Sequence, residues 1–139
     1  MYHASANELT KMALKKQELI EKFLSLTEEQ STAITNKNYD NMFKFINEKQ
    51  SIIEQVNLID LELKAITPED REKIGAITAK TKAIMSQAIA LDEENICSLR
   101  ENQAEVAQKI KELKKKKEGH HTYRGKNAAL EGILLDHKK

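Results

Sequence analysis

The hydrophobic residues of this chain recur at helical spacing along one long C-terminal stretch, from residue 68 to about residue 117. A continuous helix of roughly 50 residues would be about 75 Å long at 1.5 Å per residue. The interval from Ile77 to Leu113 fits whole helical turns, whereas a strict seven-residue repeat would return to its seam at Glu112. The pattern therefore favours a globular bundle over an extended coiled coil. The apolar positions are Ile74, Ile77, Ile84, Ala88, Leu91, Ile96, Leu99, Val106, Ile110 and Leu113.

Two shorter amphipathic helices precede this stretch. Ser5 and Glu8 form a capping box, which predicts a helix start at Ala6, and the apolar spacing continues to about residue 36. The polar run 36–38 breaks the pattern, and a second helix is predicted over about residues 39–64. Because its apolar set is wide enough to contact two neighbours, we expect it to form the middle layer, antiparallel to the first helix.

Clear start signals separate the long C-terminal helix from the second one. Thr67 is an N-cap residue, Pro68 suits the first helical position, and two acidic residues follow. Gly75 weakens the first turns, and Asn95 falls on the apolar stripe, where it needs a buried partner. The predicted fold is all-α: a three-helix antiparallel bundle over residues 1–118 with a long projecting C-terminal helix.

Residues 119–139 are predicted to form a flexible tail, because helical periodicity is lost and glycines gather there. The glycines are Gly119, Gly125 and Gly132. The tail also carries a short apolar cluster, which a purely solvated segment would not need. The cluster contains Leu130, Ile133, Leu134 and Leu135.

The amino-acid composition mainly excludes certain classes of function. The 139 residues are 32% charged with a net charge of +1, so no global field attracts nucleic acid or an anionic membrane. Cys97 is the only cysteine, which rules out an intrachain disulfide. The N-terminal residues lack a signal-peptide pattern, and no apolar run of about 20 residues would span a membrane. We expect a cytoplasmic, soluble protein with no nucleic-acid partner.

No catalytic residue, cofactor site or metal site emerges from the motifs. His120 and His121 are adjacent in the predicted tail, and with His137 they would make a poorly preorganised metal site. The lysine run 114–117 suits a solvated helix end better than a phosphate contact. Cys97 has no histidine nearby in sequence, so we expect its thiol to be unreactive. We therefore expect no enzyme activity.

Several segments resemble the bacterial flagellar export chaperones of the FlgN type. In that family, a first helix ends in a polar turn, and a second helix begins with an acidic, tyrosine-containing stretch and carries a Lys-Gln motif. The last long helix carries an asparagine next to aliphatic residues. The matching segments of this chain are 24–30, 36–40, 45–53, 91–96, Tyr123 and 133–139. The related FliT-type chaperones share this size and helical character, so the sequence leaves both types open.

The resemblance implies a function and a set of partners. Such chaperones hold C-terminal helical segments of flagellar axial proteins in the cytoplasm and deliver them to the type III export apparatus. Clients of the FlgN type are the hook–filament junction proteins, and the client of the FliT type is the filament cap protein. Two alternatives stay open: a coiled-coil structural or adaptor protein that self-associates, here as a weak homodimer, and a nucleic-acid-binding helical module.

The partner-binding site is predicted along the C-terminal half of the long helix, together with the tail. Because the first two helices are shorter, the later turns should project beyond them and expose their apolar residues more than Ile77, Ile84 and Leu91. The predicted binding residues are Leu99, Val106, Ile110, Leu113, Leu130, Ile133 and Leu134.

Overall fold

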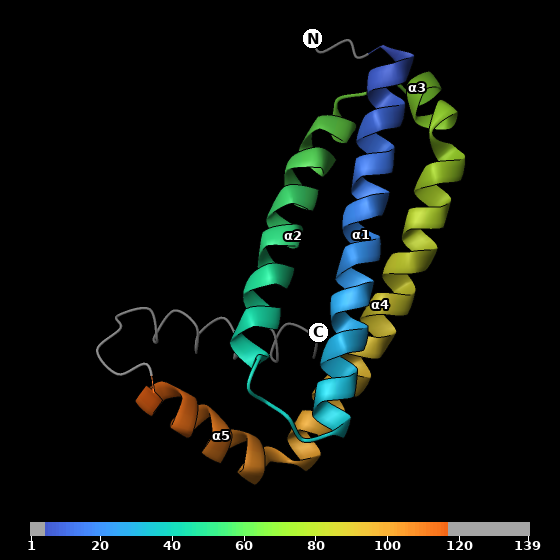
Figure 1. Cartoon of the computed structure of the whole chain (residues 1–139). Coiled ribbons are helices and arrows are strands. Elements are labelled where there is room, and N and C mark those ends of the chain that lie inside the picture. Colours follow the sequence, from blue (N-terminus) through green and yellow to red (C-terminus); the bar gives the residue numbers. More distant parts are fainter. Residues whose placement is uncertain (1–4, 117–139) are drawn as a thin grey trace. The chain divides into compact units, whose positions relative to one another are not determined.

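The computed structural model describes residues 5–116, which contain five helices and no strand. The helices are α1 (Ala6–Thr35), α2 (Met42–Lys64), α3 (Pro68–Lys73), α4 (Gly75–Glu101) and α5 (Gln103–Lys116) (Figure 1). The all-α prediction is confirmed for this part of the chain. The predicted tail, with Leu130, Ile133 and Leu134, lies outside the described residues.

Two of the predicted helix starts are confirmed by their capping hydrogen bonds. The Glu8 amide donates to Oγ of Ser5 over 3.1 Å, at the start of α1. The Asp70 amide donates to Oγ1 of Thr67 over 3.2 Å, and Pro68 occupies the first turn of α3. Side-chain oxygens here accept from backbone amides that would otherwise have no partner.

The connection between α1 and α2 is a tight polar turn. The Asn38 amide donates to the Ala33 carbonyl over 2.8 Å, and the Lys37 amide donates to the Ile34 carbonyl over 3.0 Å. This pair of bonds is the Schellman motif, which requires a left-handed residue after the helix. Lys37 takes that role with φ 55, in a conformation more often adopted by glycine.

The predicted continuous C-terminal helix is wrong, because the structure interrupts it at Ile74 and at Asn102. Ile74 leaves helical geometry with φ −102 and ψ 10, and its side chain is buried. At Asn102, backbone hydrogen bonding continues on both sides: its amide donates to Ser98, and its carbonyl accepts from Val106. A change of direction that keeps these bonds leaves the spacing of apolar residues intact, so periodicity gives no sign of it. Among the helices of residues 5–116, α1 is the longest, with 30 residues.

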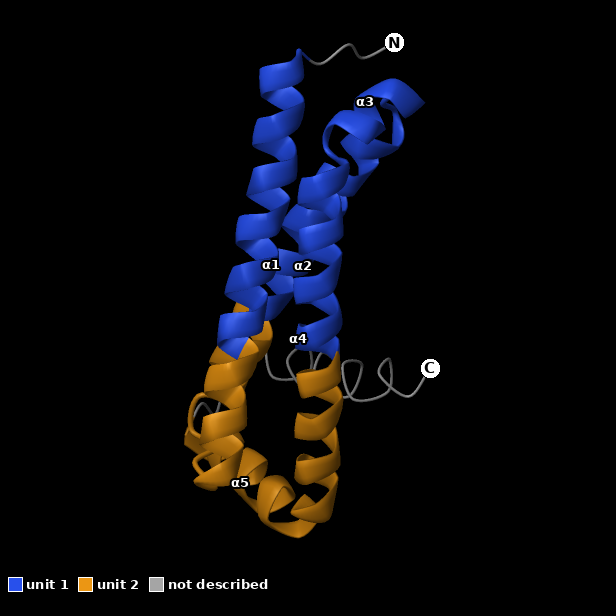
Figure 2. Cartoon of the chain, turned by 90° about the vertical axis from the view of Figure 1, so that its right-hand side faces the viewer, with its two compact units in different colours: residues 1–26, 49–89 blue, residues 27–48, 90–139 orange. Residues whose placement is uncertain are grey.

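The chain divides into two compact units (Figure 2). Of the described residues, unit 1 contains 5–26 and 49–89, and unit 2 contains 27–48 and 90–116. Three helices, α1, α2 and α4, contribute to both units. Each unit has its own apolar cluster.

Unit 1 is built from the first part of α1, the last part of α2, α3 and most of α4. Its buried cluster consists of Leu9, Ala13, Ile66 and Ile74, with Met12, Leu63 and Ile77 packed against it. Residues early in α1 meet residues late in α2, so these two helices run antiparallel within the unit. Lys49 is also buried here, with its Nζ 4.7 Å from the centre of the Phe23 ring.

Unit 2 joins the end of α1, the start of α2, the end of α4 and the whole of α5. Its buried cluster consists of Ile34, Tyr39, Met42, Ile46 and Leu99, with Val106 and Ile110 packed against it. The buried Asn95 side chain donates from Nδ2 to the Thr27 carbonyl over 3.2 Å. The predicted need of Asn95 for a buried partner is therefore confirmed.

Candidate functional site

Unit 1 contains a pocket of about 280 Å³ between α1, α2 and α4. Most of its surface comes from aliphatic or methyl-bearing side chains, and its polar residues lie among them. The lining residues are Ala13, Lys16, Ile20, Val56, Asp60, Leu63, Thr78, Thr81, Lys82 and Met85. A concave, mainly apolar surface with few polar groups is the usual form of a binding site.

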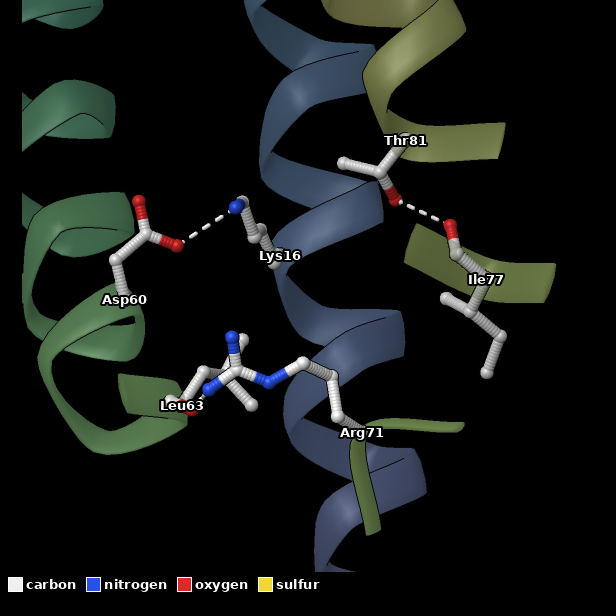
Figure 3. A network of polar contacts seen from close by, with 6 residues as sticks. All are labelled: Lys16, Asp60, Leu63, Arg71, Ile77 and Thr81. Atoms are coloured by element: carbon white, nitrogen blue, oxygen red, sulfur yellow. Dashed lines mark hydrogen bonds and ion pairs between the residues drawn. The ribbon is translucent and has the colours of Figure 1, made fainter. Parts of the chain in front are cut away.

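The polar groups of this pocket are largely paired within the chain (Figure 3). Lys16 on α1 and Asp60 on α2 form an ion pair of 2.6 Å between Nζ and Oδ1. The Thr81 hydroxyl donates to the Ile77 carbonyl over 2.9 Å, inside its own helix. Both interactions remove a polar group from competition for a ligand, and both leave carbon atoms to line the pocket.

Lys82 is the exception among the charged lining residues. Its side chain is exposed at the pocket, and it has no ion-pair partner within residues 5–116. Since Lys16 and Asp60 neutralise each other, Lys82 gives the pocket a net positive charge. The surface thus combines an apolar hollow with one cation that is open to a partner.

The predicted binding residues that the structure describes belong to unit 2, and none of them lines this pocket. Leu99 and Leu113 are buried, with 6% and 8% of their surface exposed. Val106 and Ile110 are partly buried and pack against the unit 2 cluster. The expected order of exposure is wrong, because Ile77, Ile84 and Leu91 are only partly buried while Leu99 and Leu113 are buried.

The reason for this reversal is the break at Asn102. A straight helix would carry its later turns beyond the hairpin, but α5 instead packs on residues at the end of α1 and the start of α2. Its apolar residues therefore complete the unit 2 cluster. Whether they also bind a partner stays a prediction.

Two ion pairs hold α5 against the α1–α2 connection. Asp40 and Lys109 approach to 2.7 Å, and Lys37 and Glu105 approach to 3.3 Å. The Lys109 ammonium donates to the Asp40 carboxylate and so lowers the pKa of Asp40, while the same bond raises the pKa of Lys109. All four side chains keep contact with water, so these pairs set the position of α5 more than they stabilise it.

The Tyr39 side chain is an unusual member of the unit 2 cluster. It is 4% exposed, and its hydroxyl is buried with no hydrogen-bond partner among residues 5–116. An unsatisfied buried hydroxyl costs about 1–3 kcal/mol. The cluster thus tolerates one unpaired polar group.

The pocket was not predicted from the sequence. The only available signal was the presence of small or hydroxyl-bearing residues on the apolar stripes, at Ala13, Thr78 and Thr81. These residues belong to helices far apart in the sequence, so only the packed unit shows that they leave a common space. The exposure of Leu58 and Leu61 on α2, at 64% and 63%, was also not predicted from the sequence.

Other kinds of site have no support in the described residues. Between residues 5 and 116, no three His, Cys, Asp or Glu side chains come together in a group that would hold a metal ion. His120, His121 and His137 lie outside this range. None of the described helices is long and apolar enough to cross a membrane. Cys97 is exposed and carries a free thiol.

Comparisons with protein-family models, with curated proteins and with solved structures found no match to this chain.

Proposed function

We propose that this protein is a cytoplasmic export chaperone of the FlgN type, which binds helical C-terminal segments of flagellar hook–filament junction proteins and delivers them to the type III export apparatus. The identity of the client class rests on the resemblance of segments 24–30, 36–40 and 45–53 to that family. We also propose an antiparallel three-helix bundle, in which α3, α4 and α5 together replace the single long helix predicted from the sequence.

The single structural observation that supports client binding is the unit 1 pocket. It is bounded by three helices and lined mainly by carbon atoms, with its ion pair and its Thr81 hydroxyl already satisfied. A client helix buries an apolar face that would otherwise polymerise, and a hollow between helices can accept such a face reversibly. The pocket therefore suits the proposed task better than it suits a reaction.

Co-expression with candidate clients tests this function. The tagged full-length chain is expressed with the C-terminal helical segment of a hook–filament junction protein, and separately with that of a filament cap protein. We expect the first segment to co-purify at a defined stoichiometry. Capture of the cap segment alone would assign the FliT type instead, and capture of neither by a folded chain would contradict the chaperone proposal.

A second candidate function, self-association as a structural or adaptor protein, is favoured by Leu58 and Leu61. These two leucines lie one turn apart on α2 and expose most of their surface. Light scattering across a range of concentrations tests this alternative. A dimer that dissociates in Leu58→Glu/Leu61→Glu, while client capture is unchanged, would support self-association as a separate property.

A further inference from the structure

We propose that the unit 1 pocket accepts two aliphatic side chains from one face of a partner helix, and that Lys82 pairs with a carboxylate one turn farther along that helix. This inference deepens the proposed function, on which it rests for the client as the source of the helix. It is carried by the chemistry of the pocket walls and by Lys82, a lining residue that forms no ion pair with any of residues 5–116.

The pocket is large enough to hold side chains of a partner protein. Sites for drug-sized ligands and cofactors span about 300–1,000 Å³. At about 280 Å³, this pocket lies near the lower end of that range. It has room for one or two aliphatic side chains that reach inward from a backbone lying outside it.

The chemistry of the walls favours aliphatic side chains in particular. Ala13, Ile20, Val56, Leu63 and Met85 present carbon atoms, and the flexible thioether of Met85 adapts to different shapes. The Thr81 hydroxyl already donates within α4. A polar side chain placed here would lose water and gain few hydrogen bonds, which disfavours it relative to an aliphatic one.

The charge of the pocket favours an acidic partner residue. Lys16 and Asp60 are held together at 2.6 Å, so each neutralises the other. Lys82 is left to meet the partner's charge, and its ammonium sits on a long, exposed side chain that can follow a carboxylate. The pairing is exposed to solvent, so we expect it to select among partners more than to set their affinity.

An α-helix can present two aliphatic side chains and one acidic side chain on the same face. Residues three or four apart lie on the same face of a helix, so two aliphatic residues one turn apart can enter one pocket together. An acidic residue one turn farther on continues the same face and comes within reach of the rim. The inferred partner is therefore an amphipathic helix with the order aliphatic, aliphatic, acidic, each one turn apart.

Fluorescence anisotropy with the full-length chain tests this inference. Two labelled helical peptides are used, each with two leucines one turn apart, followed one turn later by glutamate in one peptide and lysine in the other. We expect the glutamate peptide to bind about fivefold more tightly at low salt, which is the scale of an exposed ion pair. Added salt should shrink this preference.

Two variants and their matched controls locate the site. Lys82→Glu should reverse the preference between the peptides, whereas Lys80→Glu, an exposed change on the same helix away from the pocket lining, should keep it. Thr78→Trp should fill the pocket and weaken both peptides at least tenfold, while Ala79→Trp should not. Thr78 and Ala79 are both exposed, and circular dichroism checks that all four variants stay folded.

The outcomes separate this inference from the proposed function. If Lys82→Glu leaves the preference unchanged, or if Thr78→Trp binds as well as Ala79→Trp, the inference is overturned. Binding of the co-purified client by Thr78→Trp at full affinity would place the client elsewhere and leave the chaperone function standing. Failure of the wild-type chain to bind the client would instead count against the function itself.

Discussion

The two units of this chain use similar amphipathic helices and leave different surfaces behind. In unit 2, α5 turns at Asn102 and completes a cluster that already holds Leu99 and Tyr39. In unit 1, the helices pack around a cluster near Leu9 but leave an apolar pocket of about 280 Å³ beside it. An apolar stripe on a helix shows only that this surface tends to be buried. Whether a helix of the same chain covers it, as α5 does in unit 2, decides whether an apolar surface is left for a binding partner.

The two units should differ most in how far the free energy of unfolding falls when one apolar side chain is shortened to alanine. Leu99→Ala removes a buried side chain from the unit 2 cluster and should lower the free energy of unfolding by about 2–5 kcal/mol. Val56→Ala removes atoms from the wall of a pocket that is already empty on one side, so we expect a loss of about 1 kcal/mol. Urea unfolding followed by circular dichroism measures both.

Leu58→Ala is the control for this pair. Its side chain is 64% exposed, so the free energy of unfolding should change by no more than about 0.5 kcal/mol. Equal losses for Leu99→Ala and Val56→Ala would mean that the pocket wall is packed as tightly as the unit 2 cluster. The contrast between the units would then fail.

A smaller effect of opposite sign is expected at Tyr39. Tyr39→Phe removes a buried hydroxyl that has no partner among residues 5–116 and keeps the ring, so it should raise the free energy of unfolding by about 1 kcal/mol. The same urea unfolding experiment measures the gain. Tyr39→Ala is the comparison, since loss of the ring should destabilise the protein; destabilisation by Tyr39→Phe would show that the hydroxyl has a partner in solution.

The smallest effect concerns the charges that hold α5. Because Lys109 lowers the pKa of Asp40, carboxyl-detected NMR should find the Asp40 titration below the ordinary value of 3.8. Lys109→Met should move it back toward that value, whereas Lys111→Met, which removes a charge outside this pair, should leave it in place. An Asp40 midpoint that does not respond to Lys109→Met would contradict the ion pair.

The pH range of this contact follows from the two shifts. A lowered pKa of Asp40 means that its contribution is present above the unfolded pKa and is lost as pH falls through the folded pKa. A raised pKa of Lys109 means that its contribution is present below the unfolded value near 10.5 and is lost as pH rises through the folded pKa. The contact is therefore complete across the neutral range.

Local signals in the sequence predicted the starts of α1 and α3. The side chains of Ser5 and Thr67 each accept the expected hydrogen bond from the backbone amide three residues later. The buried Asn95 was also predicted, because a polar residue on an apolar stripe needs a partner wherever the helix packs. These features depend on residues within one helix or just before it, so the sequence alone is enough to predict them.

The break at Asn102 and the unit 1 pocket depend on distant parts of the chain. Neither proline nor glycine marks Asn102, and its backbone bonds continue on both sides, so the reason for the turn lies in Ile34, Met42 and the rest of the cluster that α5 covers. The pocket likewise needs α1, α2 and α4 in register. Periodicity reports which face of a helix is apolar, and it carries no information about which apolar face finds a neighbour.

Methyl NMR of the full-length chain with the glutamate peptide tests most directly whether unit 1 is open and unit 2 is closed. We predict that the methyl signals of Ile20, Val56 and Leu63 shift on binding, because these side chains line the pocket. The signals of Ile34, Val106 and Ile110 should stay in place, because these residues are committed to the unit 2 cluster. Shifts concentrated at Val106 and Ile110, with Val56 unchanged, would contradict the account.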